Sequence, residues 1–382
     1  MLPVAALSGW VIGRGKQSRR IADPDCREIP ADYFKGLNFL LNEQQDQAIE
    51  VFTQMLEADS NKVETHLALG SLFRRRGEVD RAIRVHQNLI ARPALEAEQK
   101  YAALFELGQD YLRAGVFDRA ETLFRELVDN KTHSRQSFQF LLDIYQQEKD
   151  WDRAIQAARR LETVTGEKRS ELIAQYYCEL AEESWQAQET AAARKLLRRA
   201  LSAHRGCARA SLIEARLELE EGNAKGAVRA LKRVEQQDPD YLPEIIEPLM
   251  QAYGQLGRTG ELREYLEQLL ARHAGISTML ALVDLVRREE GEDKAGEFIA
   301  DYLCQRPSVR GMDRLIEINL RRSEGTARTN LQVLKDVTDQ MLKGKPVYKC
   351  ANCGFTGKVL HWQCPSCKQW NTVKPIHGVE GE

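Results

Sequence analysis

The sequence predicts an all-α protein: a solenoid of paired helices followed by a small metal-binding ribbon. Three observations predict this fold. Small residues recur every 34 to 39 residues over most of the chain. Alanine, leucine, glutamate and arginine, which favour helix, are abundant, whereas the chain has 11 prolines in 382 residues. Two C-x-x-C pairs stand close together near the C-terminus.

The composition sets limits on function. The formal net charge is −2, so no overall electrostatic field draws the chain to nucleic acid or to anionic lipid. Four of the eight cysteines are scattered singly and suggest no disulfide framework: Cys26, Cys178, Cys207 and Cys304. This cysteine usage predicts a reducing compartment, the cytosol.

Residues 1–20 form an apolar segment with a basic flank. The run MLPVAALSGWVIG is uncharged, and RGKQSRR follows it. A membrane-spanning helix needs about 20 apolar residues, so the run is short. A secretory signal would carry its basic residues before the run. We interpret the segment as part of a membrane anchor whose basic flank places the rest of the chain in the cytoplasm. The alternative is a short interfacial or buried helix.

Most of the remaining chain repeats itself. An alanine in the motif DRAI or a variant of it marks each unit, and the spacings are 34, 38, 34, 39 and 34 residues: Ala48, Ala82, Ala120, Ala154, Ala193 and Ala227. Twelve residues before the first three alanines stand Gly36, Gly70 and Gly108. Small residues are needed where paired helices cross, because a larger side chain would push the axes apart. This is the tetratricopeptide pattern.

We therefore predict a tetratricopeptide-repeat solenoid over residues 31–342, with about seven to nine repeats, of which the last are degenerate. Such solenoids present surfaces that bind peptides or partner proteins. We expect the small and aromatic repeat positions, together with Cys178, Cys207 and Cys304, to serve packing. Arginine runs such as Arg74–Arg76 and Arg198–Arg199 are typical of solvated helix faces.

The C-terminal segment 346–376 predicts a metal site with four thiolate ligands: Cys350, Cys353, Cys364 and Cys367. Two residues between paired cysteines let a tight turn direct both sulfurs to one ion, and two such turns close a tetrahedral shell for one zinc or one iron. A catalytic zinc would keep an open position, so we expect a structural metal or an electron carrier. A redox-active pair would need an α/β context, and disulfides conflict with the cytosol.

Several residues near these cysteines have other expected roles. We expect five lysines to offset part of the negative charge of a metal bound to four thiolates: Lys345, Lys349, Lys358, Lys368 and Lys374. His361 is expected to lie outside the ligand set. Trp362 and Trp370 are expected to pack the ribbon against the solenoid, with its last turns as the nearest candidate.

No catalytic motif is recognisable. GWVIGRGKQS resembles a phosphate-binding loop, but Trp10 and Gln17 stand where a glycine and a serine or threonine are required. G-x-S-x-G and H-E-x-x-H motifs do not occur, and the seven histidines are dispersed. The sequence therefore predicts that the protein is not an enzyme.

The segments GLNFLL, LGSLFRRRGEVDRAIRVHQ, YYCELA and CGFTGKVLHWQCPSCKQWNTVKPI closely resemble the lipopolysaccharide assembly protein B family. The resemblance runs from about Tyr33 to the C-terminus. It implies a bacterial inner-membrane protein with a single-pass anchor, a cytoplasmic solenoid and a rubredoxin-like C-terminal module that packs on the repeats. It also assigns the four cysteines as metal ligands. The apolar start of the family is normally longer than the one in this chain.

The resemblance further implies a regulatory function. Members of the family are adaptors that help to present LpxC, the deacetylase that commits precursors to lipid A, to the membrane protease FtsH, and an inner-membrane partner antagonises them. Three alternatives are a redox protein with an iron-loaded ribbon, a generic tetratricopeptide scaffold, and a DNA-related role. The last rests on the likeness of CPSCKQWNT to the zinc ribbon of the RadA recombination protein. The RadA ATPase core is missing here, so no nucleic-acid partner is expected.

Overall fold

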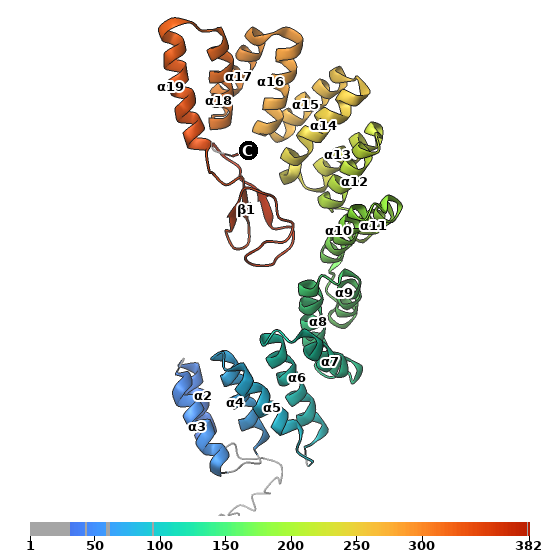
Figure 1. Cartoon of the computed structure of the whole chain (residues 1–382), viewed down its shortest axis with the longest axis vertical. Coiled ribbons are helices and arrows are strands. Elements are labelled where there is room, and N and C mark those ends of the chain that lie inside the picture. Colours follow the sequence, from blue (N-terminus) through green and yellow to red (C-terminus); the bar gives the residue numbers. More distant parts are fainter. Residues whose placement is uncertain (1–30, 43, 59–61, 94, 380) are drawn as a thin grey trace, which may run out of the picture. The chain divides into compact units, whose positions relative to one another are not determined.

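The computed structural model describes residues 31–382, apart from residues 43, 59–61, 94 and 380. Within these residues the chain folds into α-helices from Ala31 to Leu342 and then into a three-stranded sheet (Figure 1). The predicted all-α solenoid with a small C-terminal ribbon is thus confirmed. The chain divides after Ser137 into two compact units, and each unit is described by itself.

The first unit contains three antiparallel helix pairs. Their bounds are α2 Ala31–Leu41 with α3 Gln45–Ala58, α4 Val63–Arg75 with α5 Val79–Ile90, and α6 Ala97–Arg113 with α7 Phe117–Asp129. Gly77 and Gly115 follow α4 and α6 with φ of +83° and +76°, a conformation that glycine adopts without strain. These two glycines therefore allow the tight turns that bring each second helix back against the first.

The small residues of the repeat pattern lie where the helices of a pair cross, as the sequence predicts. A Cβ atom added to Gly36 or Gly108 would come within 2.6 or 2.8 Å of a phenylalanine ring on the second helix. At Gly70 the neighbouring ring belongs to His86. All six marker alanines are fully buried: Ala48, Ala82, Ala120, Ala154, Ala193 and Ala227. Close packing at these crossings is therefore what fixes the repeat.

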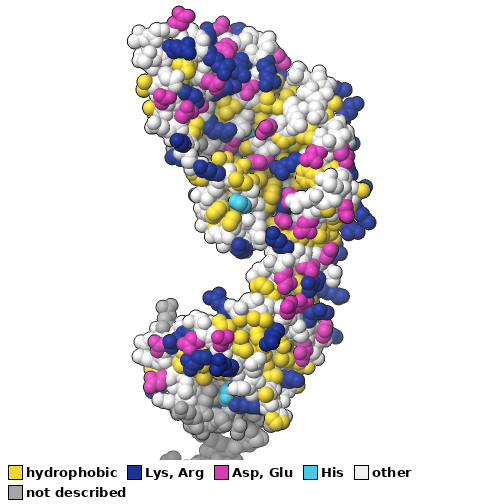
Figure 2. Space-filling model, in the orientation of Figure 1, with side chains coloured by type: hydrophobic (Ala, Val, Ile, Leu, Met, Phe, Trp, Pro, Cys, Tyr) yellow, Lys and Arg dark blue, Asp and Glu magenta, His cyan; other side chains and the backbone are white. Residues whose placement is uncertain are grey.

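The second unit begins at Phe138, inside α8 Ser134–Glu148, and contains further helices. Its further helices are α9 Trp151–Thr165, α10 Ser170–Gln186, α11 Thr190–Ala203, α12 Ala208–Glu220, α13 Ala224–Gln237, the 3₁₀ turn η1 Pro239–Tyr241, α14 Leu242–Leu256, α15 Thr259–His273, α16 Ile276–Glu290, α17 Glu292–Gln305, α18 Val309–Arg322 and α19 Gly325–Leu342. Their main core runs from α12 to α16 around Tyr241, Leu249 and Leu266. On the face that Figure 2 shows, charged side chains of both signs are spread over the helices of this unit.

The ribbon follows α19 and forms a small antiparallel sheet. Its strands are β1 Tyr348–Cys350, β2 Thr356–Gly357 and β3 Val373–Pro375, in the order β2-β1-β3. Tyr348 pairs with Gly357 on one side and with Pro375 on the other. The central strand therefore ends at the first cysteine of the predicted metal site, which ties the site to the sheet.

The predicted single-pass inner-membrane localisation is wrong for the part of the chain that the structure describes. No helix there combines the length and the apolar character that crossing a bilayer requires. The apolar run at residues 1–13, on which the prediction rests, lies outside the described residues. A membrane anchor therefore forms no part of the function proposed below.

The scattered cysteines have different environments. Cys178 and Cys207 are buried, as expected for packing residues, and their sulfurs lie 3.8 Å apart. Cys304 is exposed, so the expectation that it is buried is wrong. The buried side of α17 carries Ala295 and Ile299. Cys304 comes five residues after Ile299, which turns it about 140° away from that side at 3.6 residues per turn. Cys26 lies outside the described residues.

Candidate metal centre

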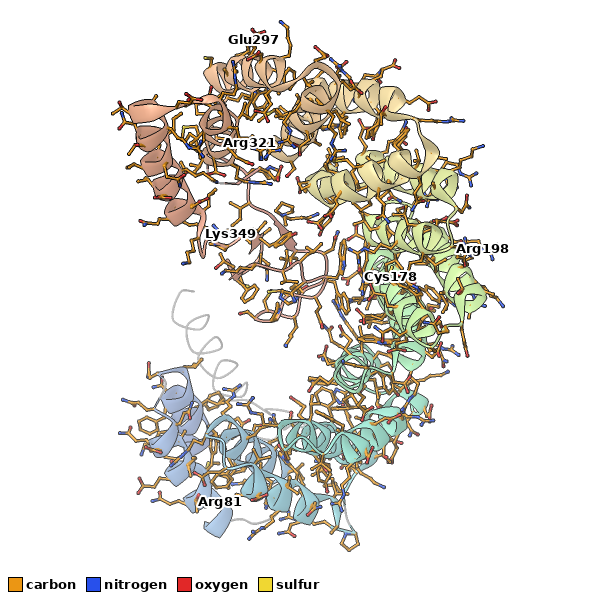
Figure 3. All side chains as sticks on the ribbon, turned by 45° about the horizontal axis from the view of Figure 1, so that its top comes forward. Arg81, Cys178, Arg198, Glu297, Arg321 and Lys349 are labelled. Atoms are coloured by element: carbon orange, nitrogen blue, oxygen red, sulfur yellow. The ribbon has the colours of Figure 1, made fainter. Side chains whose placement is uncertain are left out.

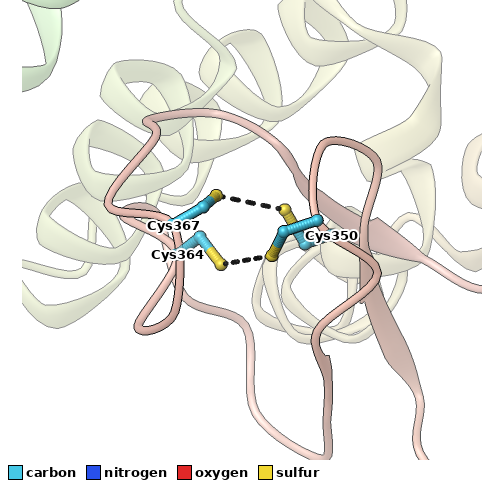
Figure 4. Close-up of side chains that lie close together, drawn as sticks. Cys350, Cys364 and Cys367 are labelled. Atoms are coloured by element: carbon cyan, nitrogen blue, oxygen red, sulfur yellow. Dashed lines mark hydrogen bonds between the residues drawn. The ribbon is translucent and has the colours of Figure 1, made fainter. Parts of the chain in front are cut away.

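Four cysteine sulfurs converge at one end of the ribbon. The Sγ atoms of Cys350 and Cys367 are 3.8 Å apart, those of Cys353 and Cys364 are 3.6 Å apart, and all four lie within 4.8 Å of one another (Figure 4). A disulfide bond would bring two sulfurs to about 2.05 Å. The four cysteines are therefore thiols or thiolates that face a common centre.

This arrangement fits a tetrahedral metal ion. Zinc binds thiolate sulfur at about 2.3 Å, which separates the sulfurs of a tetrahedron by about 3.8 Å. The two sulfur–sulfur distances given above match that edge length. Four soft donors with no carboxylate or imidazole among them suit zinc or a single iron. The donor set thus fits the metal that the sequence predicts, without deciding between the two ions.

Each C-x-x-C pair is held by a tight backbone turn. In the first turn, Cys350 N–H donates to the Phe355 carbonyl at 2.7 Å and Gly354 N–H donates to the Cys350 carbonyl at 3.0 Å. In the second, Cys364 N–H donates to the Gln369 carbonyl and Lys368 N–H to the Cys364 carbonyl, both at 2.9 Å. Because the two turns share one hydrogen-bond pattern, they direct their cysteines alike.

The residue after each pair adopts a left-handed conformation, but the two residues differ in type. Gly354 has φ of +78°, as suits the turn that the sequence predicts there. Lys368 occupies the equivalent place with φ of +59°, a strained conformation for a residue with a side chain. Sequence reasoning missed this position, because lysine gives no turn signal.

The protein environment shifts the thiol pKa values in opposite directions. Burial raises the pKa of Cys350, but the Thr372 hydroxyl and the backbone N–H groups of Asn352 and Cys353 outweigh it and lower the pKa to about 6. Burial raises the pKa of Cys364 to about 11, although two backbone N–H groups of its own turn oppose the shift. Crowded thiolates repel one another, so a cation is needed for all four to ionise together.

The basic and aromatic neighbours of the site have more specific roles than the sequence suggests. Lys374 forms an ion pair with Asp238 and lies 4.0 Å from the centroid of the Tyr241 ring, so it bonds to the solenoid. His361 packs against Phe355, with ring centroids 6.1 Å apart. Within the described residues, the group of converging ligand atoms contains the four cysteines and no histidine.

Trp370 connects the ribbon to helices α8, α9 and α10. Its indole N–H donates to Gln146 Oε1 at 2.9 Å. Its ring meets those of Trp151 and Tyr176 edge to face, with centroids 6.0 and 5.8 Å apart. Figure 3 shows the ribbon, which carries Lys349, beside α10, which carries Cys178. The predicted packing role of this tryptophan is therefore observed, but against the first helices of the second unit.

Trp362 and the residues that follow it connect the ribbon to η1. The ring centroids of Trp362 and Tyr241 are 4.9 Å apart. The Tyr241 hydroxyl lies 2.9 Å from Asn371 Oδ1 and 3.1 Å from the Val373 carbonyl, and Tyr241 is fully buried. Tyr348 adds a hydrogen bond to Glu244 of α14 at 2.5 Å. Tyr241 thus contacts the ribbon in two ways: its ring packs against Trp362, and its hydroxyl forms hydrogen bonds with Asn371 and Val373.

Arg209 of α12 lies beneath both tryptophans. Its guanidinium carbon is 5.7 Å from the centroid of Trp362 and 5.8 Å from that of Trp370, within reach of a cation–π contact. Its charge is balanced by Glu179 at 2.8 Å and Glu182 at 2.7 Å, and the side chain is 2% exposed. Sequence reasoning identified neither Arg209 nor Tyr241, because a single arginine or tyrosine in a helical repeat carries no local signal.

The expected docking on the last solenoid turns is therefore wrong for the two tryptophans of the ribbon. Trp362 and Trp370 contact α8–α10, α12 and η1, because the chain folds back after α19. The C-terminal residue contacts later helices: the Glu382 carboxylate accepts from Ser277 N–H of α16 at 3.1 Å and pairs with Arg310 of α18 at 2.6 Å. The prediction fails because it assumes that the ribbon packs on the helices nearest to it in sequence, and in a solenoid such proximity is a poor guide to contact.

Comparison with known proteins identifies the parts of the chain. Residues 348–375 match the family described as a rubredoxin metal binding domain. Residues 65–100, 105–167 and 184–246 match tetratricopeptide-repeat families. A protein named lipopolysaccharide assembly protein B from Escherichia coli K12 is 39% identical over 382 residues, which cover 100% of this chain and 98% of the relative. The protein of the same name from Haemophilus influenzae is 35% identical with the same coverage.

The chain belongs to the lipopolysaccharide assembly protein B family. The match spans both the repeats and the ribbon, so membership rests on the whole chain. Among solved structures, the Naa15/Naa10 complex bound to HypK-THB contains a chain with a TM-score of 0.45 and 15% identity, over 82% of this chain and 47% of that one. By the family models that it matches, this chain combines tetratricopeptide repeats with a rubredoxin-type metal-binding ribbon, and the repeats imply protein partners.

Proposed function

We propose that the protein is a non-enzymatic adaptor that controls lipopolysaccharide synthesis by presenting the deacetylase LpxC to the protease FtsH. The observation that carries the proposal is the sequence similarity to two proteins named lipopolysaccharide assembly protein B, at 39% and 35% identity over the full length of this chain. The proposal includes an inner-membrane partner that antagonises the adaptor and no nucleic-acid partner. An adaptor that binds both enzymes raises the local concentration of LpxC at the protease without catalysing a reaction.

In this proposal the solenoid at residues 31–342 supplies partner-binding surfaces, and the ribbon at residues 346–376 completes one of them. Tetratricopeptide repeats present extended surfaces for partner proteins. The ribbon packs on α8–α10, α12 and η1 through two tryptophans, so it covers part of the surface that those helices would otherwise expose to a partner. Loss of the ribbon would therefore alter the solenoid surface as well as the ribbon itself.

We propose that Cys350, Cys353, Cys364 and Cys367 hold one zinc or one iron ion. The converging sulfurs and the matching rubredoxin family support this assignment. The ion would supply folding free energy to a segment whose own buried cluster is small, with Cys350, Cys364 and Val373 as its buried members. A bound ion fixes the two turns, and these turns position Trp362 and Trp370 against the solenoid.

The test is the stability of LpxC in cells. In the bacterium that encodes this chain, a Cys364→Ser, Cys367→Ser strain should show a several-fold longer LpxC half-life and more lipopolysaccharide. Cys304→Ser is the matched control, because that cysteine is exposed on α17 and lies outside the converging group. An unchanged LpxC half-life in the double variant, with normal protein abundance, would refute the adaptor function.

A redox protein is the second candidate, because the matching family is of the rubredoxin type and four thiolates also suit iron. Elemental analysis of the purified protein from cells grown with both metals, together with a visible spectrum, separates the candidates. One iron per chain with a reversible bleach on reduction would favour electron transfer. One zinc per chain without colour would leave the adaptor, since zinc has no redox chemistry in proteins.

A further inference from the structure

Helix α11 has an unusual charge composition. Among the α-helices that the structure describes, it alone contains no aspartate or glutamate, although it carries four basic residues: Arg194, Lys195, Arg198 and Arg199. Helix α13 carries four more basic residues against one acid, Glu235. Acidic residues slightly outnumber basic ones over the chain as a whole, at 57 to 55. The positive charge of these two helices is therefore local and is not a property of the composition.

Three of the eight basic side chains already have partners within the fold. Arg194 pairs with Glu218 and Glu221, and Arg233 pairs with Glu214. Lys232 lies over the rings of two tyrosines. The other five are exposed and form no salt bridge with any described residue: Lys195, Arg198, Arg199, Lys225 and Arg229. We call these five residues the basic ridge.

The residues of the basic ridge share one side of the second unit. Lys195, Arg198 and Arg199 stand three and four residues apart on α11, and Lys225 and Arg229 stand four apart on α13, so each set shares a helix face. Glu218 pairs with Arg194 of α11, and the charge of Arg229 of α13 also acts on it, so the two helices flank one carboxylate. In Figure 3, Arg198 points outward, on the side away from the ribbon.

We propose that the basic ridge is a docking surface for an acidic segment of a partner protein. Exposed cations that form no salt bridge within the fold keep their charge available to a partner, and complementary charge accelerates and orients association. Arg198 of the ridge points away from the ribbon, so a partner that binds at α11 would leave the ribbon accessible (Figure 3). The inference stands whether or not the partners of the adaptor are those proposed above, because its test uses the purified protein.

The surroundings of the ridge favour an acidic protein over other polyanions. Helices that bind anionic membranes carry large apolar side chains beside their basic ones, but the exposed large hydrophobic residues of the described chain include none between Val164 and Met312. Proteins that bind single-stranded nucleic acid stack bases on aromatic side chains, and α11 and α13 contain no aromatic residue. Neither of these partners finds the side chains that it needs here.

The experiment measures binding of a fluorescein-labelled peptide of twelve residues, eight of them aspartate or glutamate, to the full-length protein at low and at physiological salt. Binding should weaken as salt rises. The variant Lys195→Glu, Arg198→Glu, Arg199→Glu should bind about thirtyfold more weakly, because each of the three exposed charge pairs is worth about threefold in affinity. The control is Arg306→Glu, Arg328→Glu, Lys343→Glu, which alters the net charge equally at exposed positions at the end of α17, in α19 and at the end of α19.

Salt-sensitive binding that the ridge variant loses and the control variant keeps supports the proposal. Absence of peptide binding, or equal loss in both variants, overturns it. Tighter binding to vesicles of phosphatidylglycerol, or to a single-stranded oligonucleotide, than to the peptide also overturns it. Circular dichroism of each variant verifies that the helices are intact, and a ridge variant that misfolds is replaced by Lys195→Gln, Arg198→Gln, Arg199→Gln with the same expected direction.

Discussion

Replacing Trp370 with alanine should release the ribbon from the solenoid. The substitution removes the hydrogen bond to Gln146, two edge-to-face contacts with Trp151 and Tyr176, and the cation–π contact with Arg209. An aromatic pair is worth about 0.5–1.5 kcal/mol, a hydrogen bond about 1 kcal/mol and a cation–π contact about 0.5–1 kcal/mol. The indole is half-buried, so we expect a loss of about 3 kcal/mol, which raises the undocking equilibrium roughly 100-fold.

Hydrogen–deuterium exchange of the metal-loaded protein measures this equilibrium. Peptides covering residues 369–376 and α8–α9 should exchange faster in Trp370→Ala, while the metal content stays unchanged. Trp185→Ala is the matched control, because Trp185 is also half-buried and donates one hydrogen bond, to Glu220 at 2.9 Å. An acceleration below about threefold, or the same acceleration in both variants, would show that Trp370 does not hold the ribbon in place.

Two further predictions concern the solenoid. Gly70→Ala should destabilise the first unit by about 1–3 kcal/mol, because the new Cβ would meet the His86 ring at 2.3 Å. Gly254→Ala, which meets nothing within 4 Å, should leave the calorimetric transition unchanged or raise it. Arg194 lowers the pKa of Glu218 below its ordinary 4.5, although burial opposes the shift. The stability advantage over Glu218→Gln should therefore be complete above pH 4.5 and disappear as the pH falls through the lowered pKa.

The repeat and the metal ligands could be predicted from local patterns. Gly70 and Gly108 mark crossings because close approach of two helices excludes larger residues, and Gly36 meets the same constraint in the first repeat. The C-x-x-C spacing of Cys350 and Cys353 is itself the geometry of a tight turn, so the sequence alone indicates that both sulfurs point one way. Patterns that act within one helix pair or one turn are thus readable from the chain.

Contacts between distant segments could not be predicted in the same way. The burial of Arg209 between two acidic residues and two tryptophans needs α10, α12 and the ribbon together. The pairing of His86 with the buried Asp110, at 2.5 Å, likewise joins two repeats. The local sequence around Arg209 or His86 does not distinguish a buried arginine or histidine from an exposed one. Each environment is formed by helices or strands that lie elsewhere in the chain.

The sequence by itself determined that this protein is a helical-repeat solenoid with a four-cysteine ribbon, because both features depend on periodicity and spacing within short segments. The tertiary structure decided where the ribbon docks and which side chains contact Trp362 and Trp370. It also decided that Arg194 of α11 pairs with acidic residues of the next repeat, whereas Lys195, Arg198 and Arg199 form no salt bridge with any described residue. These outcomes depend on the total rotation that results when small helix–helix rotations add up along the second unit. No single repeat encodes that total.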